Sequence, residues 1–360
     1  NNSVVIGAKI TDVRMFGFNI HDSLARHNSN NGIINSTILR SGWNDINLGE
    51  DNNTIGAYAI NNTVGYCSDV GIATYGWNCE ISNNIVLGVN NTIGGGGSAH
   101  YGIAVEDGGN NLIQNNTVTG CSVGIILGTG SPTRSNFVVS NNIANCITGI
   151  HSYLSSGDVI TKNNIVNWGA GYTGLAIYIL NEDNDIISFN TMVFNNANAG
   201  GACSLSNVAN VAFCNNTIIM PVSAPDSLGV ALDNAYSCLI QGNSVQALAG
   251  ILVSSSCNNN KINNNSVNST YPLINNGVAT IINPLTSSTY RLIFNNIYDS
   301  SSRGTYTYSK SIQITISSTT LDGSLNVNGV NVTLTSGSYT LLMNADYFVY
   351  ALSGTVTITP

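Results

Sequence analysis

The stretches Asn61–Val64 (NNTV), Asn83–Val86 (NNIV) and Asn115–Val118 (NNTV) decide how this chain folds. Each places a pair of asparagines before a small or β-branched residue and an aliphatic one. The signature returns, complete or shortened, at 141–143, 163–166, 190–193, 215–218, 243–245 and 264–267. Counted on the last Asn of each copy, the steps run from 22 residues (62 to 84) to 32 residues (84 to 116). A period of this length predicts stacked structural repeats.

A second repeated signal lies between the Asn motifs and consists of Gly followed by an aliphatic residue. Its glycines are Gly71, Gly102, Gly124, Gly149, Gly174, Gly229 and Gly250. The chain holds 57 Asn, 53 of them before residue 301, and Asn is poor in helix interiors but good in turns. Only short apolar stretches separate these turn residues. We therefore expect coils of a parallel β-helix, in which turn asparagines bond their counterparts one coil on, with Gly94–Gly97 looped out.

These two repeats make the chain resemble the right-handed parallel β-helix repeat proteins, which include pectate-lyase-like and carbohydrate-binding or sugar-hydrolysing domains. The motifs carry the resemblance over roughly residues 1–297. It implies an all-β fold with a right-handed parallel β-helix of about 10–11 coils over residues 1–299. It implies little about function, because this fold hosts lyases, hydrolases, epimerases, phage tailspikes, adhesins and inert surface proteins.

The last sixty residues have a different character. Asn falls to four after residue 300, Ser and Thr rise, and polar and apolar residues alternate at 311–316 and 355–358. Asn328-Gly329 between two apolar stretches is a strong hairpin signal. We expect a small antiparallel β-sandwich-like module at 300–360. It would cover the exposed edge of the last coil, support assembly or bind glycan.

Composition excludes several classes of protein. Charged residues make up 8% of the chain and the formal net charge is −8, so no basic face for nucleic acid is expected. No apolar run is long enough to span a membrane. No signal-peptide pattern precedes the first coil strand, which suggests a secreted, extracellular or cell-surface protein whose leader has been removed. An uncapped first coil favours self-association through the helix ends or the C-terminal module.

Cysteines and glycosylation sequons follow the repeat. None of the eight Cys forms a CxxC pair, so they are expected as small buried hydrophobes, with a disulfide between adjacent coils left open. Asn-x-Ser/Thr sequons arise from the turn motif itself, and some are expected to carry glycans in a secreted glycoprotein. The candidate sites are Asn35, Asn52, Asn61, Asn90, Asn115, Asn215, Asn264, Asn268 and Asn331.

Acidic and aromatic side chains concentrate between Trp43 and Arg134, where Lys and Arg are otherwise absent. Aligning the coils on the Gly-aliphatic signal places Trp43, Asp69 and His100 in one column. Sugar sites combine rings that stack on pyranose faces with carboxylates that bond hydroxyls. The predicted substrate-binding residues are Trp43, Asp45, Tyr75, Trp77, Tyr101, Tyr153 and Tyr178.

Paired carboxylates on neighbouring coils make glycoside hydrolysis geometrically permissible. Equivalent groups lie about 5 Å apart in adjacent coils and about 10 Å apart in next-but-one coils, which brackets the separations of retaining and inverting glycosidases. Glu106 and Asp69 are the predicted acid and base, with His100 and Asp107 in support. No cofactor is required.

A lyase fits less well, because its base and the neutralising cations are scarce here. Bound Ca²⁺ would supply positive charge, with Asp45, Glu50 and Asp51 as oxygen ligands. The Asp pair with Gly-His-Gly and Arg-x-Lys of polygalacturonases and the Lys/Arg set of pectate lyases are both missing. Two functions therefore stay open: a polysaccharide- or surface-glycan-directed protein, as a hydrolase or a binder, and a non-catalytic adhesin or filament subunit.

Overall fold

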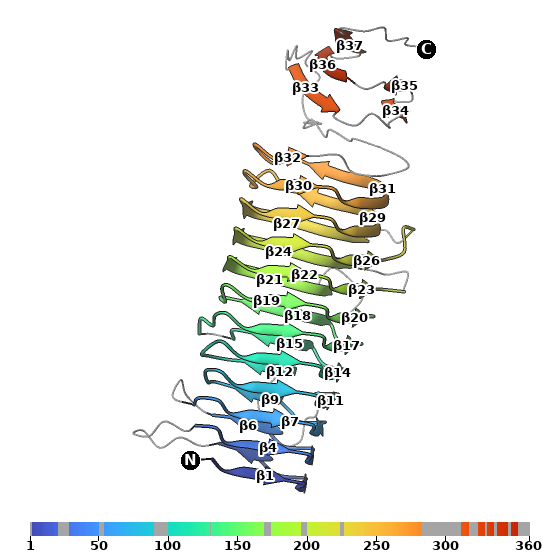
Figure 1. Ribbon diagram of the computed structural model, residues 1–360. Coiled ribbons are helices and arrows are strands. Elements are labelled where there is room, and N and C mark those ends of the chain that lie inside the picture. Colours follow the sequence, from blue (N-terminus) through green and yellow to red (C-terminus); the bar gives the residue numbers. More distant parts are fainter. Residues whose placement is uncertain are drawn as a thin grey trace, which may run out of the picture.

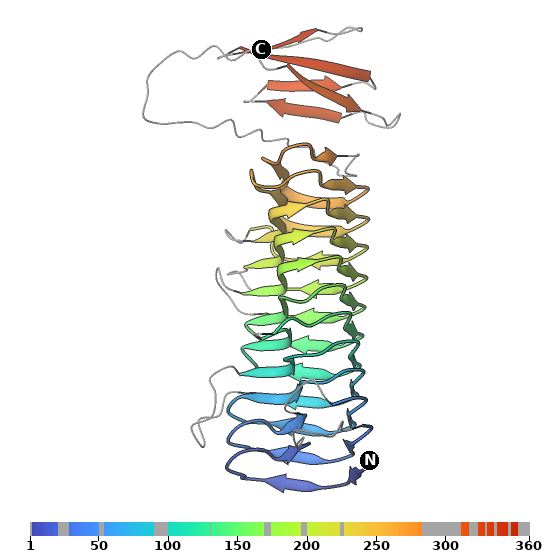
Figure 2. The ribbon, with the colours of Figure 1, turned by 90° about the vertical axis from the view of Figure 1, so that its left-hand side faces the viewer.

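The computed structural model describes residues 2–20, 29–49, 54–89, 100–129, 131–168, 174–195, 200–223 and 227–282, together with five strands between 311 and 351. Residues up to 282 form one stack of coils, in which corresponding strands of successive coils lie side by side along the stack axis (Figures 1 and 2). All pairings in this stack are parallel, and its described residues contain no helix. The predicted parallel β-helix is confirmed. Nothing in the described residues forms a helix that could cross a lipid bilayer.

One side of every coil contributes a strand to a twelve-stranded parallel sheet. In order along the stack, its strands are β1 (Val4–Ile6), β4 (Gly32–Ile34), β7 (Tyr58–Ile60), β10 (Glu80–Ser82), β13 (Leu112–Gln114), β16 (Phe137–Val139), β19 (Val159–Thr161), β22 (Ile186–Ser188), β25 (Ala212–Cys214), β28 (Leu239–Gln241), β30 (Lys261–Asn263) and β32 (Ile281–Ile282).

The other side forms a twenty-stranded sheet, to which most coils give two strands. The first strand of each coil belongs to the series β2 (Lys9–Thr11), β5 (Thr37–Leu39), β8 (Thr63–Gly65), β11 (Ile85–Leu87), β14 (Thr117–Thr119), β17 (Asn142–Ala144), β20 (Asn164–Val166), β23 (Thr191–Val193) and β26 (Thr217–Ile219). The second belongs to β3 (Phe18–Asn19), β6 (Ile46–Leu48), β9 (Val70–Thr74), β12 (Tyr101–Val105), β15 (Val123–Leu127), β18 (Thr148–Tyr153), β21 (Leu175–Asp183), β24 (Gly201–Ala209) and β27 (Leu228–Tyr236). In the last coils the two merge into β29 (Ser244–Val253) and β31 (Ser266–Asn275).

A buried ladder of asparagines joins the coils at the corner between the two sheets. In each step the backbone N–H of one residue donates to the Oδ1 of its counterpart one coil on, as from Asn84 to Asn116 and from Asn116 to Asn141, both at 2.9 Å. The Asn116 Nδ2 also donates to Asn141 Oδ1 and to the Ile81 carbonyl. The ladder satisfies buried backbone groups that the turn leaves without a sheet partner, as predicted. Its members are Ser36, Asn62, Asn84, Asn116, Asn141, Asn163, Asn190, Asn216, Asn243 and Asn265.

The residue before each ladder position takes a left-handed backbone conformation. Asn61, Asn115 and Asn215 have φ between 54° and 56°, a region that Asn tolerates better than most side chains. In these Asn-Asn pairs the first residue forms the turn and the second belongs to the ladder. Sequons at these positions follow from turn chemistry, while glycan attachment stays a prediction. The sequon residues Asn52 and Asn90 lie outside the described residues.

The alignment on the last Asn of each motif was wrong at two coils. In the structure Asn142 and Asn164 are the first residues of their strands, and Asn141 and Asn163 occupy the ladder. At both coils the left-handed turn residue is not Asn but Ser140 or Lys162. The motif NN alone therefore does not reveal which asparagine points inward.

Apolar side chains form continuous columns inside the stack. Ile81, Ile113 and Val138 come from successive strands of the twelve-stranded sheet and are fully buried. Similar columns of Ile, Val and Leu line the inner face of the twenty-stranded sheet, and together they form one core. All eight cysteines are free and all but Cys214 are buried, which confirms the expectation of cysteines as small core residues.

Five C-terminal strands pair antiparallel, as expected for a small β module. They are β33 (Ser311–Ile316), β34 (Gly323–Val327), β35 (Val330–Leu334), β36 (Gly337–Asn344) and β37 (Tyr347–Ala351). Strand β36 pairs with both β33 and β37. Strand β34 pairs with β35, with Val327 and Val330 as register partners. The predicted boundary at 299/300 and the turn at Asn328-Gly329 lie outside the described residues.

The ladder predicts a large difference between neighbouring asparagines. Asn141→Ala removes the acceptor of the Asn116 N–H and the donor to the Ile113 carbonyl, both buried. We expect a loss of roughly 3 kcal/mol in unfolding free energy, because each unsatisfied buried group costs about 1–3 kcal/mol. Asn142→Ala is the control: its side chain is exposed and bonds only Asn164 across the surface. Urea unfolding of both variants tests this, and equal losses would contradict the ladder's role.

Candidate functional site

The outward face of the twenty-stranded sheet gathers several of the predicted side chains. Parallel pairing places Ala104, Ile126, His151 and Tyr178 in one outward row on successive coils. Val105 and Ser152 both pair with Leu127 of the coil between them, so Glu106 and Tyr153, which follow them, share the next row two coils apart. We call the surface formed by Asp69, Tyr75, Tyr101, Glu106, His151, Tyr153 and Tyr178 the aromatic–acidic face.

Glu106 is the centre of the N-terminal half of this face. Its Oε2 accepts a 2.7 Å hydrogen bond from the Tyr75 hydroxyl and a 3.4 Å bond from the Thr129 hydroxyl. Partial burial raises the pKa of Glu106, the Tyr75 bond opposes the rise, and the negative charge of Asp69 adds to it. Burial and the charges of Glu106 and Asp69 likewise raise the pKa of Tyr101. The structure thus brings the predicted pair Glu106 and Asp69 within electrostatic reach.

His151 and Tyr178 form the second half. Their rings stack with centroids 4.8 Å apart and an interplanar angle of 11°. The ring centroid of Tyr153 lies 6.2 Å from that of His151. Burial lowers the pKa of His151, so its imidazole is neutral at physiological pH. Sequence analysis predicted both tyrosines but missed His151. The signal was available, because His151 follows Gly149-Ile150 as Ala104 follows Gly102-Ile103.

Other predicted residues lie beside the aromatic–acidic face. Trp77 follows strand β9 at the next corner, where the Arg134 guanidinium carbon lies 5.4 Å from its ring centroid. Trp43 is 40% exposed and meets Phe16 edge to face. Asp107 accepts a bond from the N–H of the adjacent Gly108.

His100 and Asp69 precede the paired strand residues Tyr101 and Val70. His100 has a left-handed backbone, and its carbonyl accepts the Ser122 N–H. The catalytic roles of Asp69, Glu106, Asp107 and His100 stay predictions, as do the sugar-binding roles.

Asp45 lies inside the stack and not on its surface. Its carboxylate is fully buried and accepts bonds from the Ser41 hydroxyl and N–H on one oxygen and from the Gly65 N–H on the other. Burial raises its pKa to about 7. Glu50 and Asp51, the other predicted Ca²⁺ ligands, lie outside the described residues. Substrate and metal binding by Asp45 therefore stay predictions.

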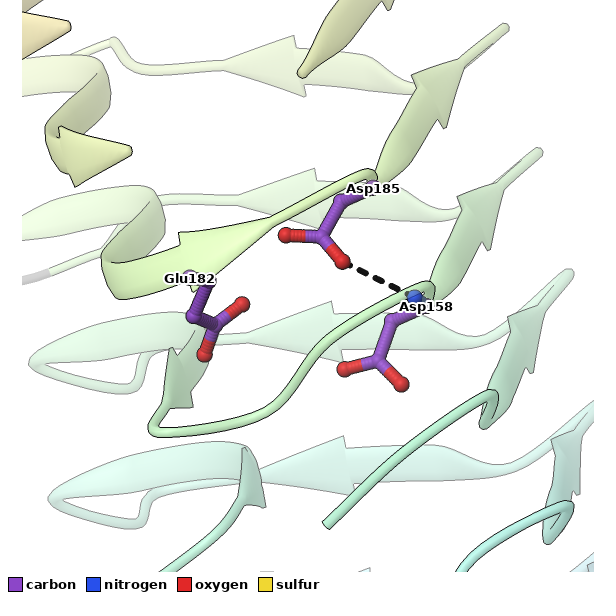
Figure 3. Close-up of side chains that lie close together, drawn as sticks. All are labelled: Asp158, Glu182 and Asp185. Carbon is purple, nitrogen blue, oxygen red and sulfur yellow. Dashed lines mark hydrogen bonds between the residues drawn. The ribbon is translucent and has the colours of Figure 1, made fainter. Parts of the chain in front are cut away.

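Three further carboxylates meet at an inner corner of the stack, between the twenty-stranded and the twelve-stranded sheets. Asp158, Glu182 and Asp185 come from two successive coils, and one ligand oxygen of each lies within 4.8 Å of the others (Figure 3). All three residues are at most 3% exposed. Below, these three residues are called the carboxylate cluster.

Two members of the carboxylate cluster occupy positions of a second ladder. Before the cluster, the N–H of Asn111 donates to Asn136 Oδ1 one coil on. The Asn136 N–H then donates to Asp158 Oδ1, and the Asp158 N–H to Asp185 Oδ1, both at 2.8 Å. An aspartate can replace asparagine here because the ladder needs only an acceptor oxygen at the next coil.

The remaining oxygens of the cluster are only partly satisfied. Asp158 Oδ2 accepts a bond from the Ser152 hydroxyl, and Glu182 Oε1 accepts one from the Ser155 N–H. Glu182 Oε2 and Asp185 Oδ2 are buried and have no hydrogen-bond partner. Burial first, then repulsion among the three carboxylates, raises the pKa values of Glu182 and Asp185, and burial raises that of Asp158.

Sequence analysis missed this cluster. The signal was an Asp five residues before the ladder Asn, at both Asp158 (before Asn163) and Asp185 (before Asn190). Asn111 and Asn136 precede Asn116 and Asn141 by the same five residues. The second ladder lay hidden because its members vary in type, whereas the first reads as a repeated Asn pair.

Residues 27–224, more than half of the chain, match the family model described as "Periplasmic copper-binding protein (NosD)". The chain belongs to the NosD family. No curated protein sequence matches it.

Two solved structures show what this NosD-family chain is similar to in space. The DFA-IIIase of Arthrobacter chlorophenolicus A6, without its lid and in complex with GF2, shares 10% identity at a TM-score of 0.49. That match covers 71% of this chain and 66% of the DFA-IIIase chain. The Dettilon tailspike protein shares 14% identity at a TM-score of 0.44, over 94% of this chain and 70% of the tailspike chain. At such identities the likeness concerns the fold alone.

The family description names copper, but the described residues bring together few of the donors that copper prefers. Copper in proteins favours imidazole, thiolate and thioether donors. Within the described ranges, the only group of three or more His, Cys, Asp or Glu side chains placed to hold one ion is the carboxylate cluster. Carboxylate oxygens alone do not fit copper and suit hard ions instead. His21 and His27 lie outside the described residues.

The surroundings of Glu106 predict its titration. Because burial raises its pKa in the folded chain, the protonated form stabilises the fold at low pH, and this contribution is lost as pH rises through the folded-state value. Carbon-13 NMR should show Glu106 titrating above about 4.3, the ordinary value for Glu. Tyr75→Phe should move the midpoint higher still, since it removes the bond that lowers the pKa. A midpoint at or below the ordinary value would contradict the described environment.

Proposed function

We propose that this NosD-family protein is exported and binds a neutral or weakly charged glycan along its aromatic–acidic face. The observation that carries the proposal is the Glu106 carboxyl, held by Tyr75 on an outward sheet face beside Tyr101 and Asp69. Carboxylates that accept sugar hydroxyls, next to rings that pack on apolar sugar faces, are the recurrent chemistry of glycan sites.

The geometry of the stack supports a chain-like ligand. Successive coils repeat at about 4.8 Å, close to the length of one sugar unit, so side chains in one row can meet a glycan at regular intervals. Glu106 and Tyr153 lie in the same row two coils apart, with His151 and Tyr178 in the row beside it. A ligand lying along the stack axis would contact Glu106 first and the His151–Tyr178 pair further on.

Charge supports a neutral ligand over an acidic one. Asp69, Glu106 and Asp107 are acidic, and the imidazole of His151 is neutral. A uronate polymer would meet negative potential here without a compensating cation. The family description as periplasmic supports export from the cytoplasm, where surface or matrix glycans are met.

In its catalytic form the proposal is a glycoside hydrolase. Glu106, whose raised pKa favours the protonated carboxyl, would give its proton to the glycosidic oxygen as the bond to the anomeric carbon breaks. Asp69 would serve as the second carboxylate, either attacking the anomeric carbon or taking a proton from the attacking water. Binding without cleavage needs the same residues and no proton transfer.

Glycan arrays and a sugar-release assay on the full chain test the proposal. We expect binding to neutral polysaccharides that weakens about tenfold or more in Tyr101→Ala and Tyr178→Ala, because stacked rings contribute on the order of 1 kcal/mol or more each. If the protein is a hydrolase, Glu106→Gln abolishes release while binding persists. Glu80→Gln is the matched control, since Glu80 lies on the twelve-stranded sheet.

Two outcomes would contradict the proposal. Absence of binding to every glycan would leave the adhesin or filament subunit as the better interpretation, to be followed by sedimentation of the chain at rising concentration. Binding that Tyr101→Ala and Tyr178→Ala leave unchanged would place the glycan on another surface.

A further inference from the structure

We propose that the carboxylate cluster of Asp158, Glu182 and Asp185 binds one Ca²⁺ ion at the inner corner of the stack. No residue of the aromatic–acidic face takes part, so the proposal stands independently of glycan binding. Figure 3 shows the three side chains converging from two neighbouring coils on a common space.

The negative charge of the carboxylate cluster is uncompensated in the described chain. Asp158, Glu182 and Asp185 are 0%, 3% and 1% exposed, and none of them forms an ion pair with a Lys, Arg or His of the described chain. On the next coil, Val208 is paired with Glu182, and Val211 takes the position equivalent to Asp185. Both valines are buried. Carboxylates stacked against apolar neighbours are costly to bury unless a positive charge joins them.

Two oxygens of the carboxylate cluster accept no hydrogen bond. Glu182 Oε2 and Asp185 Oδ2 are buried without any hydrogen-bond partner, and both residues belong to the cluster. Asp45 shows the contrast within the same stack: it is equally buried, but both of its oxygens accept bonds from N–H or O–H groups. A carboxylate that only closes a turn is satisfied, as at Asp45, whereas the cluster keeps acceptors that face one another.

The spacing of the cluster's oxygens matches the size of a Ca²⁺ ion. Ligand oxygens of the three side chains lie within 4.8 Å of one another. Two oxygens on opposite sides of a Ca²⁺ ion are about 4.6–5.2 Å apart, since Ca–O distances are about 2.3–2.6 Å. For Mg²⁺ the corresponding limit is about 4.2 Å, with a stricter octahedral geometry. A spacing of up to 4.8 Å between ligand oxygens therefore matches Ca²⁺ more closely than Mg²⁺.

Neighbouring groups complete an oxygen-rich site. The Ser152 hydroxyl bonds Asp158 Oδ2, and the Ser155 hydroxyl accepts a bond from Thr133 at the same corner. These buried hydroxyls would add neutral oxygens beside the three carboxylates, and water would complete the coordination of Ca²⁺.

Isothermal titration of the full chain with CaCl2, after EDTA treatment and dialysis, tests the proposal. We expect one Ca²⁺ per chain and a higher melting temperature in its presence. Asp185→Asn and Glu182→Gln should each weaken Ca²⁺ binding by about tenfold or more, because affinity follows the number of charged ligands. MgCl2 and CuCl2 should give no comparable stabilisation at equal concentration.

The substitutions keep the fold testable. Asp185→Asn retains the Oδ1 that accepts the Asp158 N–H and restores the residue found at Asn111 and Asn136. In EDTA this variant should therefore melt no lower than the parent chain, since it removes a buried charge. Asp183→Asn is the control, because Asp183 is exposed on the same strand β21 and should leave Ca²⁺ binding unchanged.

Three results would overturn the proposal. Failure of the parent chain to bind Ca²⁺ would leave shared protons as the source of neutrality in the cluster. Binding that persists in Asp185→Asn and Glu182→Gln would place the ion elsewhere. Stabilisation by Cu²⁺ alone, lost in both variants, would make the cluster a copper site despite its oxygen donors.

Discussion

Hydrogen bonding from each coil to the next is the interaction on which the whole structure depends. The backbone of a coil has no helix or hairpin to satisfy it, so its N–H and carbonyl groups pair with the coils above and below. At the corners, where sheet pairing stops, side-chain amides take over, as in the step from Asn116 to Asn141. The ladder is therefore a continuation of the sheets around a bend, and its amides are buried because the corner is part of the core.

Stacking at a constant register turns each position in the coil into a column through the molecule. In apolar columns the result is a continuous core, and in the corner columns it is a chain of amides. The same rule concentrates charge when the residue type changes, because an aspartate placed at successive coils faces another aspartate about 4.8 Å away. Asp158 and Asp185 can replace asparagine in the ladder because one oxygen of each accepts the ladder hydrogen bond. Their second oxygens then lie beside the Glu182 carboxylate inside the stack.

The outward face of the twenty-stranded sheet and the buried corner between the two sheets thus carry different chemistry in one stack of coils. Outside, Glu106 meets tyrosine rings and polar groups at the surface, where a ligand can replace water. Inside, the carboxylate cluster is buried and forms no ion pair with a basic residue of the described chain. The family description names copper, whereas the donors seen here are oxygens, which suit a hard ion. The β-helix fold explains how the coils stack, and the residue types in each column determine the chemistry at that position.

The sequence by itself determined the stacked parallel coils and the corner asparagines, because their motifs recur at a nearly regular spacing. It also determined the antiparallel C-terminal strands, because alternating polar and apolar residues are local patterns. It also aligned Asp69 with His100, which precede the paired residues Val70 and Tyr101 in the structure. Only the tertiary structure decided which asparagine of a pair turns inward at Asn141, that Asp45 is buried, and that Asp158, Glu182 and Asp185 meet. Side-chain direction at a corner depends on a single left-handed residue, and residues 27 positions apart become neighbours only once that turn sets the register.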